Sequence, residues 1–185
     1  AAFLIEPGSR FLTSYRKMRL VPGSERIPFR DYFPFNYLKD WLSDLELGVG
    51  DYTPGEEFTV FSVRPAQGGA DAPPVLLSTP ICFESVFPDL IRRFAGNGAG
   101  MLCIITNDAW FGRTSAPFQH TRFAVFRAIE NRLPVARCAN TGISCFIDPC
   151  GRVTQSTPLF KQAAITGRIT LQSKRTLYTR FGDWL

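Results

Sequence analysis

The stretch VLLSTPICFESVFPDLIRRFAGNGAGMLCIIT, residues 75–106, contains an apolar strand, a short helix and a second apolar strand. Pro88 suits the first turn of the helix, and Gly96 or Gly98 suits its end. The second strand, 101–106, is apolar throughout, which is typical of a strand buried on both faces. This strand–helix–strand unit predicts a layered α/β domain with its sheet packed under helices.

Downstream, the sequence predicts one long helix with Phe123, Phe126 and Ile129 on a single face, followed by more strands. The expected elements are the helix at 118–133, strands at 134–140, 143–149 and 163–171, and an irregular tail from Thr176. The continuous apolar strands 101–106 and 135–139 are expected at the centre of the sheet.

Upstream, the pattern is less regular but still favours strands. The expected elements are strands at 2–6 and 12–21 around a Pro7-Gly8 turn, a helix within 35–48, a strand at 58–63 and a hairpin connection at 64–74. The 185 residues suit one domain over 1–185 with one core.

Composition excludes several classes of protein. The chain is 45% hydrophobic and 20% charged, which indicates a globular domain rather than a disordered one. No run of 18 apolar residues is present to span a bilayer as a helix. The net charge is +5, but the cations are scattered, so no nucleic-acid partner is expected. The start has neither an initiator Met nor a signal-peptide pattern, so we expect a chain cut from something longer.

The five cysteines do not form a metal-binding pattern. No CxxC pair occurs, and the single histidine, His120, is remote in sequence, so neither a metal nor another cofactor is expected. Cys103, Cys138 and Cys145 lie in apolar strand-like runs and are expected to be small core residues. Cys82 differs, because it ends a strand just before a helix.

Cys82 is the candidate nucleophile. A strand-to-helix elbow holds a side chain rigidly at the edge of a sheet, where backbone N–H groups of the next turn can face an oxyanion. A buried cysteine at a strand end is the alternative. The partner of a nucleophilic thiol is either His120, at the start of the long helix, or a Lys/Glu environment around Lys17 in the strand-like run YRKMRLVP.

Several segments together resemble the nitrilase (carbon–nitrogen hydrolase) superfamily, and more narrowly the carboxy-terminal domain of the apolipoprotein N-acyltransferase family. The matching positions are Lys17, Pro22, Glu25 and Pro28; Cys82, Phe83 and Glu84; Asn107 to Gly112; Pro117 to His120; Arg127, Ala128 and Glu130; Asn140 to Gly142; Pro149 to Gly151; and the tail, Thr179 to Trp184. The unbroken Asn-Asp-Ala-Trp-Phe-Gly run beside the Gln-His helix favours the acyltransferases over soluble amidases.

The resemblance implies an α-β-β-α sandwich of the nitrilase type and a Glu-Lys-Cys triad. Cys82 is then expected to take an acyl chain from a phospholipid as a thioester and pass it to the N-terminal amine of a diacylglyceryl-lipoprotein. Lys17 is expected to stabilise the oxyanion. Glu25 and Glu84 are supporting residues, and Trp110 and Phe83 are expected to contact the substrate.

The resemblance also implies a role in lipoprotein biosynthesis at the bacterial inner membrane. The domain is expected on the periplasmic side, anchored by helices outside this chain. The family's general-base Glu precedes the Lys by many tens of residues and is not carried onto Glu6. The first strands and helices of the sandwich are therefore expected to be missing, and the 185 residues alone are expected to be inactive.

Two alternatives remain at this stage. The chain can be part of a soluble nitrilase-type amidase that hydrolyses a small carboxamide, or a non-enzymatic α/β interaction domain. Under the acyltransferase interpretation, His120 and Asp108 are expected to be structural, and Arg127 and Glu130 are expected to pair with each other along their helix or with a neighbouring loop.

Overall fold

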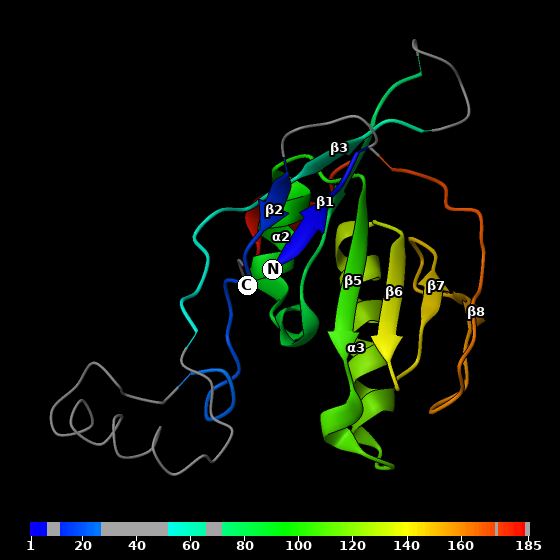
Figure 1. Ribbon diagram of the computed structural model, residues 1–185. Helices are drawn as coiled ribbons and strands as arrows, with labels where there is room; N and C mark the ends of the chain where they lie inside the picture. Colours follow the sequence, from blue (N-terminus) through cyan, green and yellow to red (C-terminus); the bar gives the residue numbers. More distant parts are fainter. Residues whose placement is uncertain (7–11, 27–51, 66–71, 173, 184–185) are drawn as a thin grey trace, which may run out of the picture.

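The main body of the protein is a six-stranded sheet with helices behind it, seen in a computed structural model that describes residues 1–6, 12–26, 52–65, 72–172 and 174–183 (Figure 1). The strands in spatial order are β3 (Phe61–Val63), β4 (Val75–Ser78), β5 (Met101–Asn107), β6 (Val135–Asn140), β7 (Cys145–Ile147) and β8 (Val153–Ser156). β4, β5 and β6 run parallel, and the outer pairs are antiparallel. β5 and β6 are central, as predicted.

The two long helices, α2 (Pro88–Gly96) and α3 (Ala116–Asn131), share one core with the sheet. Leu102 and Ile104 of β5 are fully buried in that core, whereas the alternate residues of β5 are only partly buried. This alternation follows from the two-residue period of a strand. Pro88 is the first residue of α2, as its missing N–H and fixed φ favour.

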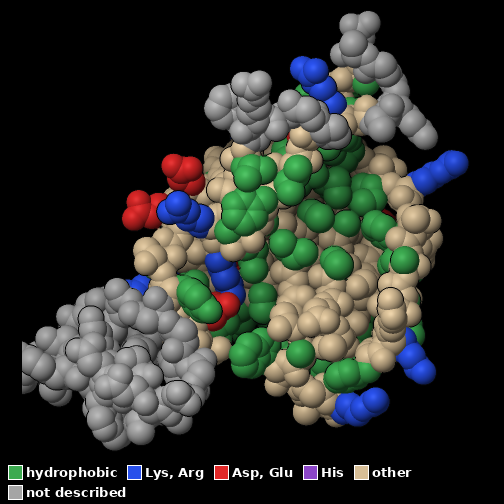
Figure 2. All heavy atoms as spheres, viewed as in Figure 1, with side chains coloured by type: hydrophobic (Ala, Val, Ile, Leu, Met, Phe, Trp, Pro, Cys, Tyr) green, Lys and Arg blue, Asp and Glu red, His purple; other side chains and the backbone are tan. Residues whose placement is uncertain are grey.

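The other face of the sheet carries hydrophobic side chains toward the viewer in Figure 2. A separate antiparallel pair, β1 (Ala2–Leu4) and β2 (Thr13–Tyr15), forms a second small sheet. The architecture therefore agrees with the incomplete α-β-β-α sandwich that the resemblance implies.

Three elements differ from the sequence-based expectation. The strand expected at 12–21 ends at Tyr15, because the backbone N–H groups of Met18 and Arg19 donate to the Glu84 carboxylate instead of to a strand. No strand forms at 163–171, and β8, which was not predicted, takes the outer edge beside β7.

The tail was expected to be irregular, but it contains a short helix, α4 (Leu177–Phe181). Its start is capped by the Thr176 hydroxyl, which accepts the Thr179 N–H at 2.9 Å. Cys138 is exposed rather than a core residue, because it lies on the open face of β6. The Pro7-Gly8 turn and the helix expected within 35–48 lie outside the described residues.

The carboxyl ends of the parallel strands meet at one edge of the sheet. Asn107 at the end of β5 is in register with Asn140 at the end of β6, and the two side chains are hydrogen-bonded at 3.0 Å. Ile81, three residues after β4, bridges to Ile105 of β5, which brings Cys82 to the same edge. Ligand sites in parallel α/β sheets form at this edge.

Candidate active site

Cys82 is the first residue of a tight turn, η1 (Cys82–Val86), directly after the Ile81 bridge. Its φ of 54° lies in the left-handed region that residues with a Cβ rarely adopt. The turn is held by the Ser85 hydroxyl, which donates to the Cys82 carbonyl at 3.0 Å, and by the Glu84 N–H, which donates to the Ile81 carbonyl. The strand-to-helix elbow predicted at Cys82 is therefore present.

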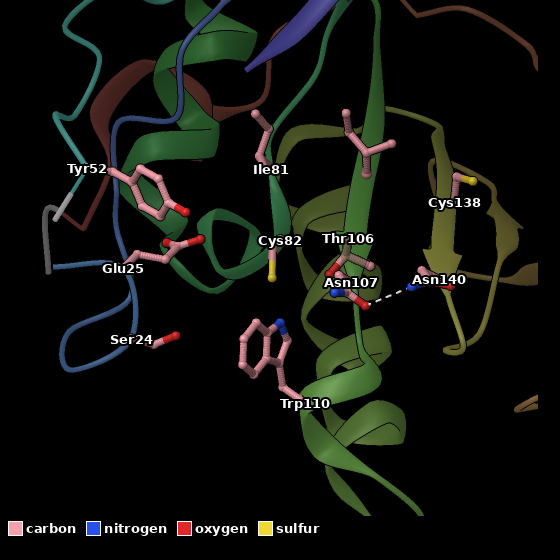
Figure 3. A pocket seen from close by; sticks show the side chains of 11 residues that line it. Ser24, Glu25, Tyr52, Ile81, Cys82, Thr106, Asn107, Trp110, Cys138 and Asn140 are labelled. Carbon is pink, nitrogen blue, oxygen red and sulfur yellow. Dashed lines mark hydrogen bonds between the residues drawn. The ribbon is translucent and has the colours of Figure 1, made fainter. Parts of the chain in front are cut away.

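The thiol of Cys82 points into an open cleft of about 640 Å³ (Figure 3). The cleft is lined by Ser24, Glu25, Tyr52, Ile81, Cys82, Ile105, Thr106, Asn107, Trp110, Cys138 and Asn140. The Trp110 indole lies beside the thiol in Figure 3 and is 75% exposed, which places a large apolar surface at the rim of the cleft.

Lys17 forms an ion pair with Glu25 from the next loop. Its Nζ lies 2.6 Å from both carboxylate oxygens, and the side chains are only 9% and 27% exposed. The carboxylate is fixed further by the backbone N–H of Val21, which donates to it at 2.8 Å. Glu25 lines the cleft that holds the Cys82 thiol, and Lys17, which is not among the described lining residues, is paired directly behind that carboxylate.

Glu84 ties the Lys17 segment to the cysteine turn. Its fully buried carboxylate accepts the N–H of Met18 at 2.6 Å, of Arg19 at 3.1 Å and of Ile81 at 2.7 Å. The Tyr15 hydroxyl donates to it at 2.7 Å. One carboxylate therefore binds the residues that follow Lys17 and the residue that precedes Cys82.

The other predicted residues occupy different surroundings. Phe83 is not among the described residues that line the cleft, and its ring packs edge-on against Phe87 at 5.2 Å. His120 is buried. One of its ring nitrogens contacts Asp108 and the other contacts the backbone carbonyl of Cys82, so the ring lies against the peptide group of Cys82 and not in the cleft. Arg127 and Glu130 pair at 2.6 Å, as predicted.

Three groups of the site were given no individual role from the sequence. Tyr15 follows the alternation of a strand and gave no separate signal, although it binds Glu84. Arg137 could have been identified from the sequence, because a charged residue inside a central apolar strand needs a buried partner. Asn107 and Asn140 could also have been assigned to the site from the sequence, because they end the two central parallel strands, where ligand sites form.

Burial and side-chain hydrogen bonds shift the pKa of Asp108 in opposite directions and the pKa of Tyr15 in the same direction. Burial alone raises the pKa of Asp108, but hydrogen bonds from His120 and Arg137 outweigh it and hold that pKa below its usual value. Burial, and then the Glu84 carboxylate, raise the pKa of the Tyr15 hydroxyl far above its ordinary value. Tyr15 therefore stays a hydrogen-bond donor to Glu84 at any physiological pH.

In the described ranges, no group of three or more His, Cys, Asp or Glu side chains is arranged to hold a metal ion. None of the helices in the described part of the chain combines the length and the apolar composition needed to cross a bilayer.

Residues 1–178 match the family model for carbon–nitrogen hydrolases. The chain is 39% identical to the apolipoprotein N-acyltransferase of Chlorobaculum tepidum over 99% of its length, and 39% identical to that of Geobacter metallireducens over 99%. It spans about a third of the length of these curated relatives. Among solved structures, it is similar to the NitN amidase from Nesterenkonia sp. AN1, at 20% identity and a TM-score of 0.49 over 80% of this chain and 48% of that one.

Proposed function

Because this chain belongs to the carbon–nitrogen hydrolase family, we propose that it supplies the catalytic cysteine and lysine of a lipoprotein N-acyltransferase. The observation that carries the proposal is that the Cys82 thiol and Glu25, the partner of the Lys17 ammonium, line one cleft. The names of the relatives favour acyl transfer over the hydrolysis of a small carboxamide. The open cleft also suits an acyl chain better than it suits a small amide.

In the first step, the Cys82 sulfur attacks the ester carbonyl carbon of a phospholipid. The thiol proton passes to the family's general-base Glu, a role that we assign to no residue of this chain. An S–C bond forms and the carbonyl oxygen becomes an oxyanion. Collapse breaks the ester C–O bond, and the leaving oxygen takes the proton back from that Glu and departs as the alcohol of a lysophospholipid. The acyl group remains on Cys82 as a thioester.

In the second step, the N-terminal amine of a diacylglyceryl-lipoprotein attacks the thioester carbonyl. A C–N bond forms, the C–S bond breaks, and a proton from the amine returns to the sulfur. The products are an N-acylated lipoprotein and the free thiol, so the cycle needs no cofactor.

Lys17 acts in both steps as the cationic group that stabilises the oxyanion, together with a backbone N–H beside Cys82. Glu25 holds the Lys17 ammonium in place through both carboxylate oxygens. Glu84 keeps the Lys17 segment and the cysteine turn in register through its four hydrogen bonds. These two acids support the reaction by placing its two reactive groups.

The acyl chain is proposed to lie along Trp110, whose exposed ring stands at the mouth of the cleft. Phe83 is proposed to stabilise the cysteine turn by packing its ring against Phe87. The proposed lipid donor and lipoprotein acceptor both reside in membranes, so the domain is proposed to act at a membrane surface, which the family resemblance makes the periplasmic side of the bacterial inner membrane.

Acyl-enzyme trapping tests the proposal. The complete gene product, in membranes with phospholipid and no lipoprotein acceptor, should gain the mass of one acyl chain on the peptide that contains Cys82, and hydroxylamine should remove it. Cys82→Ser should abolish this hydroxylamine-sensitive mass, while Cys150→Ser, at an exposed cysteine outside the cleft, should not. A hydroxylamine-sensitive acyl group in Cys82→Ser would refute the assignment.

A further inference from the structure

A closed cluster of charged side chains lies behind the cysteine turn. Asp108 Oδ1 is 2.9 Å from His120 Nδ1, and Asp108 Oδ2 accepts Arg137 Nη2 at 2.8 Å. The side chains of all three are at most 4% exposed. Gly142 packs directly against the Asp108 carboxylate, where a Cβ would overlap it. None of these four residues lines the cleft, so the cluster does not meet a substrate.

The cluster reaches the cysteine through the far side of the histidine ring. His120 Nε2 lies 3.2 Å from the Cys82 carbonyl oxygen and 3.2 Å from the Ser85 hydroxyl. The Cys82 carbonyl and the Asp108 carboxylate both only accept hydrogen bonds, so each of these two contacts is made through an N–H on the ring nitrogen that faces the acceptor. Asp108, on the opposite side, fixes the orientation of the ring. The Cys82 carbonyl is therefore held inward by two donors, His120 and Ser85.

The direction of this carbonyl determines the direction of a second group. The peptide unit that joins Cys82 to Phe83 is planar and trans, so its N–H points opposite to its C=O. With the carbonyl held toward the buried cluster, the Phe83 N–H points away from that cluster. This amide is the backbone donor adjacent to the nucleophile, where an oxyanion needs a fixed N–H.

We propose that His120 is a positioning residue, which holds the Cys82–Phe83 peptide plane so that the Phe83 N–H faces the acyl carbonyl in the cleft. The inference rests on the proposed function, since it assigns His120 a part in forming the oxyanion site. The strained φ of Cys82 makes such support necessary, because the surrounding contacts must maintain a left-handed backbone at a residue with a Cβ.

Three substitutions separate the ring's two contacts. His120→Ala removes both. His120→Gln keeps an N–H donor at about the reach of Nε2 toward the Cys82 carbonyl, whereas His120→Asn keeps one only at the position of Nδ1 toward Asp108. Gln119→Ala is the matched control, because Gln119 is the exposed neighbour on the same turn of α3.

Two reactions of the complete gene product are then compared, together with its melting temperature. Thioester formation from phospholipid passes through an oxyanion, whereas alkylation of Cys82 by iodoacetamide does not. For His120→Ala we expect the rate constant of thioester formation to fall about 10- to 100-fold, as a misdirected donor does. The KM for lipid and the alkylation rate should stay within about threefold, and Gln119→Ala should match the wild type.

The rescue decides between positioning and general stabilisation. His120→Gln should recover most of the thioester rate, and His120→Asn should not. Equal rates for these two variants, or a wild-type rate in His120→Ala, would overturn the inference while leaving the proposed function intact. A wild-type protein that forms no thioester, although iodoacetamide alkylates Cys82, would overturn the proposed function and the inference that rests on it.

Discussion

Two charged clusters flank Cys82, and they differ in what surrounds them. On one side, Glu25 is 27% exposed and part of the cleft wall, and the Lys17 side chain, 9% exposed, is paired directly behind it. On the other side, His120, Asp108 and Arg137 are sealed behind the turn. Both clusters consist of short, charge-assisted hydrogen bonds, so strength does not distinguish them.

The two clusters differ in how closely they can approach a substrate. A cation at a cleft can meet the charge that develops on a substrate, whereas a sealed ion pair acts only through the atoms that it holds. The Lys17 side is therefore expected to affect the rate more than the stability of the fold. The Asp108 side is expected to affect the stability first, and the rate only through the position of the Cys82 peptide group.

The largest expected effect is on the sealed side. Asp108→Asn should lower the free energy of unfolding by about 3–5 kcal/mol, because it leaves the guanidinium of Arg137 buried without its counter-charge. Urea unfolding followed by circular dichroism measures this. Asp89→Asn, at an exposed carboxylate paired with Arg92 and Arg93, is the control, and an equal loss in both variants would contradict the sealed-pair argument.

The same variant should change the dependence of stability on pH. The pKa of Asp108 is lower in the folded protein than its ordinary value, so the unfolded chain binds the proton first as the pH falls. Its contribution is present above the unfolded pKa of about 4 and is lost as the pH falls below that. Asp108→Asn should therefore show a shallower loss of stability below about pH 4 than the wild type.

On the open side, Lys17→Ala should reduce the rate of thioester formation by about 10²–10³, as removal of an oxyanion stabiliser does. Its unfolding curve should stay close to that of the wild type. Lys161→Ala, an exposed lysine far along the chain, is the control. Wild-type turnover in Lys17→Ala would remove the distinction between the two clusters.

Glu84 connects the two regions, and Glu84→Gln should have a mixed effect. An amide has one accepting oxygen, so a backbone N–H among Met18, Arg19 and Ile81 loses its acceptor, at a cost of about 1–3 kcal/mol. We expect a lower melting temperature together with a slower thioester step. A stable variant with a normal rate would show that Glu84 does not align the two segments.

The smallest expected effect is at the rim of the cleft. Trp110→Ala should raise the KM for a long-chain phospholipid by a few-fold and leave the rate constant almost unchanged, because the ring is exposed and is proposed to contact the acyl chain rather than the reacting atoms. Phospholipids with short acyl chains are the control and should show no difference. A large fall in the rate constant would place Trp110 at the reacting atoms instead.

The fold was predictable where the pattern was local. The apolar run of β5 and the helix after Pro88 appear at the predicted places because hydrophobic periodicity and turn chemistry act within a few residues. β8 and α4 were not predicted, since an edge strand with four exposed residues and a helix of five residues carry little periodic signal.

The site divides in the same way. The residue types and the turn around them were sufficient to select Cys82, and the motif resemblance selected Lys17 and Glu25. The tertiary structure alone decided that the strand before Lys17 stops at Tyr15, because the buried Glu84 carboxylate, 69 residues further along, takes the N–H groups of Met18 and Arg19.

The sequence by itself determined the order of the elements from β4 to β7 and the nucleophile's place at an elbow, since those depend on neighbours along the chain. Only the tertiary structure decided which charges face the cleft and which are sealed behind it. Lys17 and Arg137 are both cations in strand-like runs, yet one pairs at the cleft and the other is buried with Asp108. The surroundings of a charge come from segments distant in sequence, and its role follows from those surroundings.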